Sequence, residues 1–227
     1  MSHSLSIIIP TLDEAKNIGT TLALLKACAP EAEIIVVDGG STDDTVKLAQ
    51  EHAQVIQGTR GRAAQLNLGA SKATGEWLVF LHADTALPEN FGSAIDRATA
   101  EGYSAGVFGL TIAGRHPLLP LLGWGATMRT SLRKIFLGDQ APFIRRALFA
   151  ELGGFPQQPL MEDFEFACGL KRKNVRVYVS PLRVKTSGRR WDNKGFFRTW
   201  LLMRWIYFDY HWRGTAKTPA RYYQNER

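Results

Sequence analysis

The sequence predicts an α/β protein: a Rossmann-type, mostly parallel sheet with helices on both faces. Three apolar runs, at residues 5–9, 34–37 and 77–81, have the length and the β-branched or aromatic content of buried strands. Segments with helical spacing separate these runs, and strands that are apolar on both faces are typical of parallel sheets covered by helices. No Pro-, Gly- or Ser-rich linker interrupts the chain, so residues 1–227 are predicted to form a single domain.

The first half of the chain is predicted to alternate between strands and helices. Pro10 ends the first strand, and a helix follows to about Ala27. Ser41, with Asp44 three residues later, resembles a capping box that starts a helix reaching about His52. The remaining predicted elements are a strand at 55–56, a helix at 62–73, a helix from Pro88 and a strand at 106–112.

The second half is less regular. Its predicted elements are a helix at 118–132, a loop around Gly138, a helix at 162–173, and short strands at 175–179 and 183–186. An aromatic-rich helix follows at 195–213, on which Arg198, Asp209 and Arg213 share one narrow face. Because most of the rest of its circumference is apolar or aromatic, this helix is expected to be buried, to pair with a second subunit, or to lie in a membrane interface.

The charge of the chain points to anionic partners. There are 28 Lys and Arg against 21 Asp and Glu, a formal net charge of +7. No zinc-finger, helix-turn-helix or RNP-like pattern is present, so nucleic acid is not the expected partner. Cys28 and Cys168 form no metal-ligand pattern and are expected to be free thiols in a reducing compartment. No leader peptide or membrane-spanning run is recognised, so the expected location is the cytoplasm.

Polar side chains directly follow the third apolar run. His82 and Asp84 are two residues apart, so both can lie on one side of the strand's exit. A divalent cation that accompanies a diphosphate would suit this pair, because hard cations combine carboxylate oxygens with phosphate oxygens. Taken alone, Asp84 is better explained as the cap of a helix that Pro88 opens.

Further acids follow the first two predicted strands, with Asp13 and Glu14 after one and Asp38 after the other. The carboxyl ends of parallel strands meet at one edge of a sheet, so these acids are expected to converge with those after the third strand. Asp38 would either accept a hydrogen bond from a base or ribose, or close its own turn. A dinucleotide-binding Rossmann motif is excluded, because the first turn, residues 10–14, contains no glycine.

Taken together, these motifs resemble the family 2 glycosyltransferases, which are inverting enzymes of the GT-A fold that use nucleotide-sugars. The resemblance covers about residues 5–190 and is closest to a bacterial subgroup of small, single-domain members. It rests on segments 7–14, 36–43, 62–69, 80–84, 153–155 and 162–163, with Gly138-Asp139-Gln140 and Arg189-Arg190-Trp191. It implies a nucleotide-binding half at about 1–113, an acceptor half at about 114–190, and a C-terminal helix and tail at about 191–227.

The resemblance implies donor-binding roles for residues of the first half and for two later arginines. These are Pro10, Thr11, Asp13, Glu14, Asp38, Arg62, His82, Asp84, Arg189 and Arg190. Asp84 matches the last acid of the family's Asp-x-Asp motif, which binds Mg²⁺ or Mn²⁺ against the diphosphate. His82 stands where the first acid is usual, so it is expected either to ligate the metal, for which imidazole suits Mn²⁺ better than Mg²⁺, or to hydrogen-bond ribose or phosphate.

The catalytic role falls, by the same resemblance, on Glu162 and Asp163. Inverting transfer is one displacement at the anomeric carbon and needs a base for the acceptor hydroxyl, and Asp163 matches the family's base. Acids in a first helical turn also complement the helix dipole, which is the alternative explanation. Asp139 and Gln140 are expected either to orient the acceptor or to end a turn.

The expected activity is transfer of a sugar, with inversion and metal assistance, from a UDP- or GDP-linked donor to a hydroxyl acceptor that could be lipid-linked. One alternative is a nucleotidyltransferase of nucleotide-sugar synthesis, although the Gly-rich basic loop usual after its first strand is missing. The other is a non-catalytic protein that binds nucleotide-sugars or docks on membranes. Through residues 195–213 the chain would either form a homodimer or lie peripherally on the inner face of a membrane.

Overall fold

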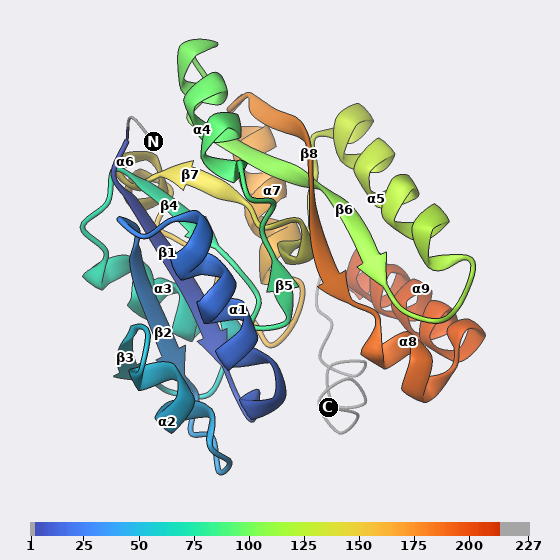
Figure 1. Ribbon diagram of the computed structural model, residues 1–227. Helices are drawn as coiled ribbons and strands as arrows, with labels where there is room; N and C mark the ends of the chain where they lie inside the picture. The colour runs from blue at the N-terminus through green and yellow to red at the C-terminus, as the bar shows by residue number, and fades with distance from the viewer. Residues whose placement is uncertain (1–2, 214–227) are drawn as a thin grey trace.

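The computed structural model describes residues 3–213, which contain a sheet of eight strands in the order β3-β2-β1-β4-β7-β6-β8-β5 (Figure 1). The strands are β1 (Leu5–Thr11), β2 (Glu33–Asp38), β3 (Gln54–Gln57), β4 (Trp77–Phe80), β5 (Thr85–Ala86), β6 (Ala105–Ala113), β7 (Phe143–Arg145) and β8 (Val177–Ser187). Among these eight strands, β7 runs antiparallel to its neighbours β4 and β6, and the edge strand β5 runs antiparallel to β8. The other pairs are parallel. The predicted mostly parallel α/β fold is confirmed.

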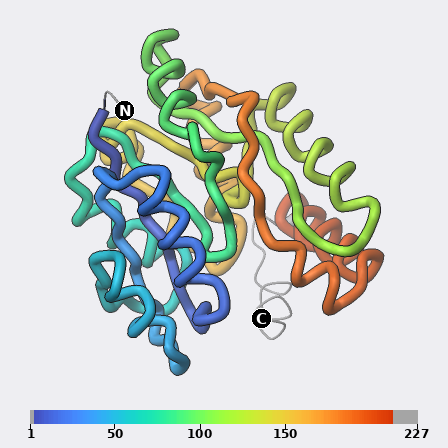
Figure 2. Tube along the Cα trace, in the orientation of Figure 1, coloured from blue at the N-terminus to red at the C-terminus, as the bar shows by residue number. Residues whose placement is uncertain are grey.

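Helices cover both faces of the sheet. Side chains alternate along a strand, so Ile7 and Ile9 of β1 enter one core cluster and Ile8 enters the other. The first core is closed by α1 (Ala15–Cys28), α2 (Thr45–Gln50), α4 (Phe91–Ala100) and α5 (Leu119–Arg133). The second is closed by α3 (Arg62–Lys72), α6 (Arg146–Glu151) and α7 (Glu162–Arg172). Figures 1 and 2 show α1 in front of the sheet and α3 behind it.

A smaller apolar cluster joins the end of the chain to the domain. After α8 (Arg189–Lys194), the long helix α9 (Phe196–Arg213) packs Ile206 against Leu160, Met161 and Phe164 at the start of α7. None of the helices within residues 3–213 is both long and apolar enough to cross a membrane. Through Ile206, α9 lies next to the segment that leads into α7.

Several predicted boundaries are wrong. Pro10 does not end the first strand but pairs in register with Val37, and β1 continues to Thr11. Ser41 does not cap a helix, because its hydroxyl bonds to Asp38, and α2 begins four residues later. The two strands expected at 175–186 are one strand, β8, which passes through an exposed Pro181 beside an irregularity in its pairing with β6.

The expected polar face of the last helix is also corrected. Asp209 is 5% exposed and lies on the buried side of α9, which also carries Ile206 and Thr199. The side facing solvent is aromatic instead, with Phe197 and Trp212 more than two-thirds exposed. The helix is thus buried along one side only, and the buried side includes the acid Asp209.

Candidate functional site

The sheet topology gathers the polar loops at one edge. β1, β2, β4, β6 and β8 run in one direction, so the loops that follow them open on the same side. Because β7 is antiparallel to both its neighbours, the loop that precedes it, including Gly138, reaches the same edge. Acids and arginines from widely separated parts of the chain therefore meet there.

The loops after β1 and β2 are tied together by hydrogen bonds to carboxylates. Asp38 is 1% exposed, and its oxygens accept the backbone N–H groups of Gly40 and Ser41, both at 2.9 Å, and the Thr11 hydroxyl at 3.2 Å. Asp13 in turn accepts the backbone N–H of Thr42 at 2.8 Å. The Asp38 carboxylate therefore fixes its own turn, which shapes the loop edge where a nucleoside is expected.

A buried glutamine completes this corner. Gln65 of α3 donates from Nε2 to the backbone oxygens of Thr11 and Val37, at 2.8 Å each, at the ends of β1 and β2. A Cβ at Gly39 would lie 3.1 Å from that same Nε2, so a larger residue there would press on the Gln65 amide. Sequence reasoning did not find this role, because a helix residue that bridges two distant strands has no local pattern.

Arg189 links the ends of β1, β4 and β8. Its Nη2 is 2.6 Å from Oε1 of Glu14 and its Nε is 3.6 Å from Oδ2 of Asp84. Burial raises the pKa of Asp84, the nearby Arg189 opposes this shift, and the charge of Glu14 adds to it. Two acids thus share one guanidinium at the edge of the sheet.

This acid pair fits a divalent cation that arrives with a diphosphate. Mg²⁺ and Mn²⁺ in such sites bind one or two carboxylates and take their other ligands from phosphate and water. Burial raises the pKa of Asp84 although Arg189 lies nearby, so a bound cation would add to the charge that favours its carboxylate form. Within residues 3–213 no group of three His, Cys, Asp or Glu side chains is placed to hold a metal ion.

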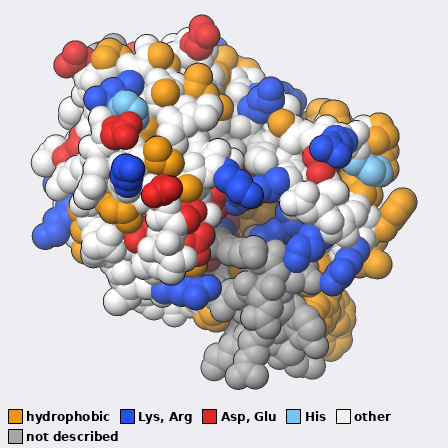
Figure 3. Space-filling model, turned by 60° about the horizontal axis from the view of Figure 1, so that its bottom comes forward, with side chains coloured by type: hydrophobic (Ala, Val, Ile, Leu, Met, Phe, Trp, Pro, Cys, Tyr) orange, Lys and Arg blue, Asp and Glu red, His pale blue; other side chains and the backbone are white. Residues whose placement is uncertain are grey.

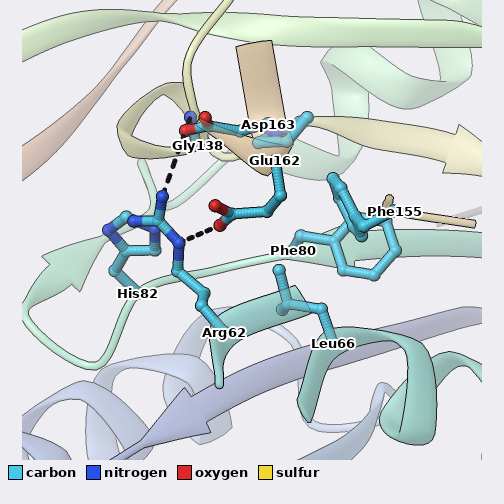
Figure 4. Close-up of a pocket in the computed structure, with 9 residues that line it drawn as sticks. Arg62, Leu66, Phe80, His82, Gly138, Phe155, Glu162 and Asp163 are labelled. Atoms are coloured by element: carbon cyan, nitrogen blue, oxygen red, sulfur yellow. Dashed lines mark hydrogen bonds and ion pairs between the residues drawn. The ribbon is translucent and has the colours of Figure 1, made fainter. Parts of the chain in front are cut away.

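A second cluster lies at the start of α7. Arg62, the first residue of α3, forms an ion pair with Glu162, and its Nη2 lies 3.6 Å from Oδ2 of Asp163. Figure 4 shows the guanidinium pointing toward both acids, with Phe80 and Phe155 forming an apolar wall nearby. One positive charge therefore faces two buried carboxylates.

The Asp163 carboxylate is held by backbone donors. Gly138 donates its N–H to Oδ2 at 2.6 Å, and Phe164 donates its N–H to Oδ1 at 2.7 Å. A Cβ on Gly138 would lie 3.1 Å from Oδ2 of Asp163 and 3.1 Å from Nε2 of His82. Asp163, Gly138 and His82 therefore converge on one point, which joins the acid of α7 to the loop after β4.

The two residues after Gly138 differ sharply. Burial, followed by the charge of Asp163, raises the pKa of Asp139 to about 6, and its Oδ1 is buried without a hydrogen-bond partner. Gln140 is fully buried; it accepts the Thr130 hydroxyl at 2.7 Å and donates to the Phe108 oxygen at 3.1 Å. Asp139 adjoins the candidate site, whereas the Gln140 amide is bonded inside the domain.

Two cavities adjoin at Arg62. The smaller, of about 10 Å³, has room for about one water and lies between Arg62, His82 and Asp163. The larger, of about 320 Å³, is bordered by Leu12, the start of α3 and residues 157–160. This larger volume falls in the range of small-molecule sites, and Arg62 separates it from Asp163.

The sheet has the GT-A fold. Two solved structures share this fold. TarS of S. aureus in complex with UDP-GlcNAc matches 82% of this chain and 59% of its own, at a TM-score of 0.67 and 20% identity. Mannosyltransferase PcManGT of Pyrobaculum calidifontis, in complex with GDP-Man and Mn2+, matches 90% of this chain and 61% of its own. Its TM-score is 0.68 and its sequence identity is 23%. The chain thus spans about three-fifths of these solved chains.

The chain belongs to glycosyl transferase family 2, whose family model matches residues 6–147. Among curated relatives, a PGL/p-HBAD biosynthesis glycosyltransferase of Mycobacterium bovis is 29% identical over 202 residues, covering 79% of this chain and 71% of the relative. A poly-beta-1,6-N-acetyl-D-glucosamine synthase of Staphylococcus epidermidis is 29% identical over 96 residues, covering 39% and 23%. The protein is a glycosyltransferase, an enzyme of the transferase class.

Proposed function

We propose that this glycosyltransferase moves a sugar from a nucleoside diphosphate donor to a hydroxyl acceptor, with inversion at the anomeric carbon. The observation that carries the proposal is the Asp163 carboxylate, buried and held by two backbone N–H groups beside Arg62. The UDP-GlcNAc and GDP-Man complexes of the two solved relatives support a nucleotide-sugar donor. The donor's base, uracil or guanine, would lie against the loops that Asp13 and Asp38 tie together, bordered by Pro10 and Thr11.

The diphosphate is proposed to lie between the two arginine clusters. Arg62 and Arg189 can each exchange a carboxylate partner for phosphate oxygens, to which guanidinium binds in a bidentate manner. Arg190 follows Arg189 at the start of α8. Asp84 would hold Mg²⁺ or Mn²⁺, with His82 as a second ligand or as a hydrogen-bond donor to the donor's ribose or phosphate. When bound, the cation would neutralise charge on the departing diphosphate.

Asp163 is proposed as the base that accepts the acceptor's hydroxyl proton during a single displacement. The hydrogen bonds from Gly138 and Phe164 hold its carboxylate in place, so little reorganisation is needed as the proton arrives. General-base assistance of this kind contributes roughly 10²–10⁴-fold in rate. Glu162 acts on Asp163 indirectly, because it anchors the guanidinium that both acids face. Asp139 would border the acceptor.

Thermal shift and product release together test this function. The chain is heated with UDP or GDP, with and without Mn²⁺, because a ligand that binds the native state raises the melting temperature. Release of the chosen nucleoside diphosphate from its sugar donor is then followed with a panel of hydroxyl acceptors. Donor binding without any release would favour the non-catalytic alternative. Release of pyrophosphate from a nucleoside triphosphate and a sugar phosphate would favour the nucleotidyltransferase.

We place the enzyme in the cytoplasm, at the inner surface of a membrane, where it would meet a lipid-linked acceptor. The free thiols of Cys28 and Cys168 support a reducing compartment. Cell fractionation, with recovery in the membrane pellet and release by high salt, tests this location. Recovery only in the soluble fraction would contradict it.

A further inference from the structure

We propose that one side of the molecule, formed by α5 and α9, is a docking surface for an anionic phospholipid bilayer. The membrane location given under the proposed function would depend on this surface. The α5–α9 face consists of Leu121, Trp124, Met128 and Leu132 of α5 and Phe197, Trp200, Leu201, Trp205, Phe208 and Trp212 of α9. Each of these side chains is at least 38% exposed.

The exposed apolar side chains form a stripe on each helix. At about 100° per residue, the four on α5 fall within an arc of about 80°, and the six on α9 within an arc of about 140°. The opposite side of α9 carries its buried residues, among them Thr199, Ile206 and Asp209. Both helices are therefore amphipathic, with their apolar stripes directed away from the domain.

The two helices lie on the same side of the molecule. His116, just before α5, stacks on Phe196 at the start of α9 with ring centroids 4.1 Å apart. Ile135, just after α5, packs against the apolar cluster that contains Ile206 of α9. Figure 3 shows hydrophobic side chains gathered with Lys and Arg on this side, at the right of the view. The two helices thus lie near each other on one side of the molecule.

The exposed charges on α5 and α9 indicate an anionic partner. The sequence of α5 contains no Asp or Glu, and the single acid of α9, Asp209, is buried. Exposed cations lie in and around the stripes: Arg133, Lys134, Arg198 and Arg204. Arg204 lies over the ring of Trp200, with its guanidinium carbon 5.6 Å from the centroid. The exposed charged side chains of α5 and α9 themselves are thus cations, and an apolar surface with such cations complements anionic lipid headgroups.

Tryptophan content supports a bilayer over a second copy of the chain. Of the six tryptophans, four lie on the α5–α9 face, and Trp is the residue most suited to the boundary between headgroups and acyl chains. A symmetric dimer through this face would bring its arginines against one another with no exposed acid on either helix to pair them. A bilayer would therefore both bury the apolar side chains and pair the arginines with anionic headgroups.

The surface adjoins the candidate site through α9. Ile206 packs on Leu160 and Met161, and Glu162 and Asp163 follow directly in the chain. A bilayer beneath α9 would lie next to the segment that carries the proposed base. The substrate class that fits this placement is an acceptor hydroxyl on a lipid headgroup, a consequence that rests on the proposed function.

The test is co-sedimentation of the full chain with vesicles of phosphatidylcholine containing about 30% phosphatidylglycerol, compared with pure phosphatidylcholine. We expect binding to the anionic vesicles, weakened by high salt, together with quenching of tryptophan fluorescence by brominated lipid. The double variants Phe197→Ser/Phe208→Ser and Leu121→Ser/Trp124→Ser should each weaken partitioning about tenfold or more. Leu24→Ser, at an apolar residue of α1 that is 49% exposed, is the matched control and should bind normally.

Charge reversal separates the electrostatic part. Arg198→Glu/Arg204→Glu should lose most binding to anionic vesicles, whereas Lys47→Glu, at an exposed lysine of α2, should not. Absence of binding by the unaltered chain would overturn the proposal, as would equal binding by all variants. So would a dimer, seen by light scattering without lipid, that the Phe197→Ser/Phe208→Ser variant dissociates. Nucleotide binding is measured separately. If the proposed function is right, nucleotide binding should be detected even where the membrane proposal is overturned.

Discussion

Arg62 and Glu162, which are 100 residues apart in the sequence, form an ion pair where α3 meets α7. Glu162 is 1% exposed, and its neighbour Asp163 lies 3.6 Å from the same guanidinium. Buried carboxylates are costly without a partner. A single arginine therefore allows two acids to lie side by side at the start of α7.

Replacing this arginine should destabilise the fold. Arg62→Met leaves Glu162 buried without its cation, and we expect a loss of about 2–4 kcal/mol in the free energy of unfolding, measured in urea at pH 7. The double variant Arg62→Met/Glu162→Gln removes both charges and should recover at least half of that loss. Arg60→Met changes an exposed arginine just before α3 and should have little effect. Similar losses for Arg60→Met and Arg62→Met would contradict this account.

Asp139 should make stability depend on pH. Its folded pKa, about 6, lies above the ordinary value of 3.8, so ionisation is less favourable in the folded state. The native protein should therefore lose stability relative to Asp139→Asn as pH rises from about 4 to 6. The variant should match the native chain near pH 4 and exceed it by up to about 3 kcal/mol at pH 7. Urea unfolding of both proteins at the two pH values measures this, and a difference independent of pH would rule out the explanation.

Gly138→Ala tests the close approach of the loop to Asp163. The added Cβ would lie 3.1 Å from the oxygen of Asp163 and from Nε2 of His82, so it should shift both groups. We expect turnover to fall by about tenfold or more, since small misplacements of reacting groups are costly. Gly19→Ala is the matched control: it meets nothing within 4 Å in α1 and should raise stability by up to about 1 kcal/mol without changing turnover. Unchanged turnover in Gly138→Ala would remove Gly138 from the site.

Asp84→Asn should abolish the part of nucleotide binding that depends on metal. Addition of Mn²⁺ with the preferred nucleoside diphosphate is expected to raise the melting temperature of the native protein more than the nucleotide alone. The variant should show only the increase due to nucleotide, because an amide binds a hard cation more weakly than a carboxylate. Glu51→Gln, an exposed acid just after α2, should respond like the native protein. A full Mn²⁺ response in Asp84→Asn would place the cation elsewhere.

The parts of the fold that were predictable are those with dense local signals. The apolar runs of β1, β2 and β4 have few alternatives, because their residues are buried on both faces of the sheet. β5 and β7, with two and three residues, are too short for periodicity to reveal them. The burial of Asp209 was also hidden, since helical spacing shows which residues share a face but not which face meets the domain.

The candidate site divides in the same way. The convergence of Asp13, Asp38 and Asp84 on one edge follows from parallel strands and could be foreseen. The pairing of Arg62 with Glu162 could not, because it depends on where α7 docks. Nor could the different surroundings of Asp139 and Gln140, which are adjacent in the sequence but differ in hydrogen bonding.

The most direct test of the central claim compares Asp163→Asn with the native enzyme. The asparagine has one oxygen left to accept the N–H of Gly138, although its NH₂ group cannot accept the N–H of Phe164. It has the size of the aspartate but cannot take up a proton, so we expect donor binding to remain within about threefold. The rate of nucleoside diphosphate release with acceptor present should fall by about 10²–10⁴-fold. Native turnover in Asp163→Asn would contradict the assignment of this carboxylate as the base.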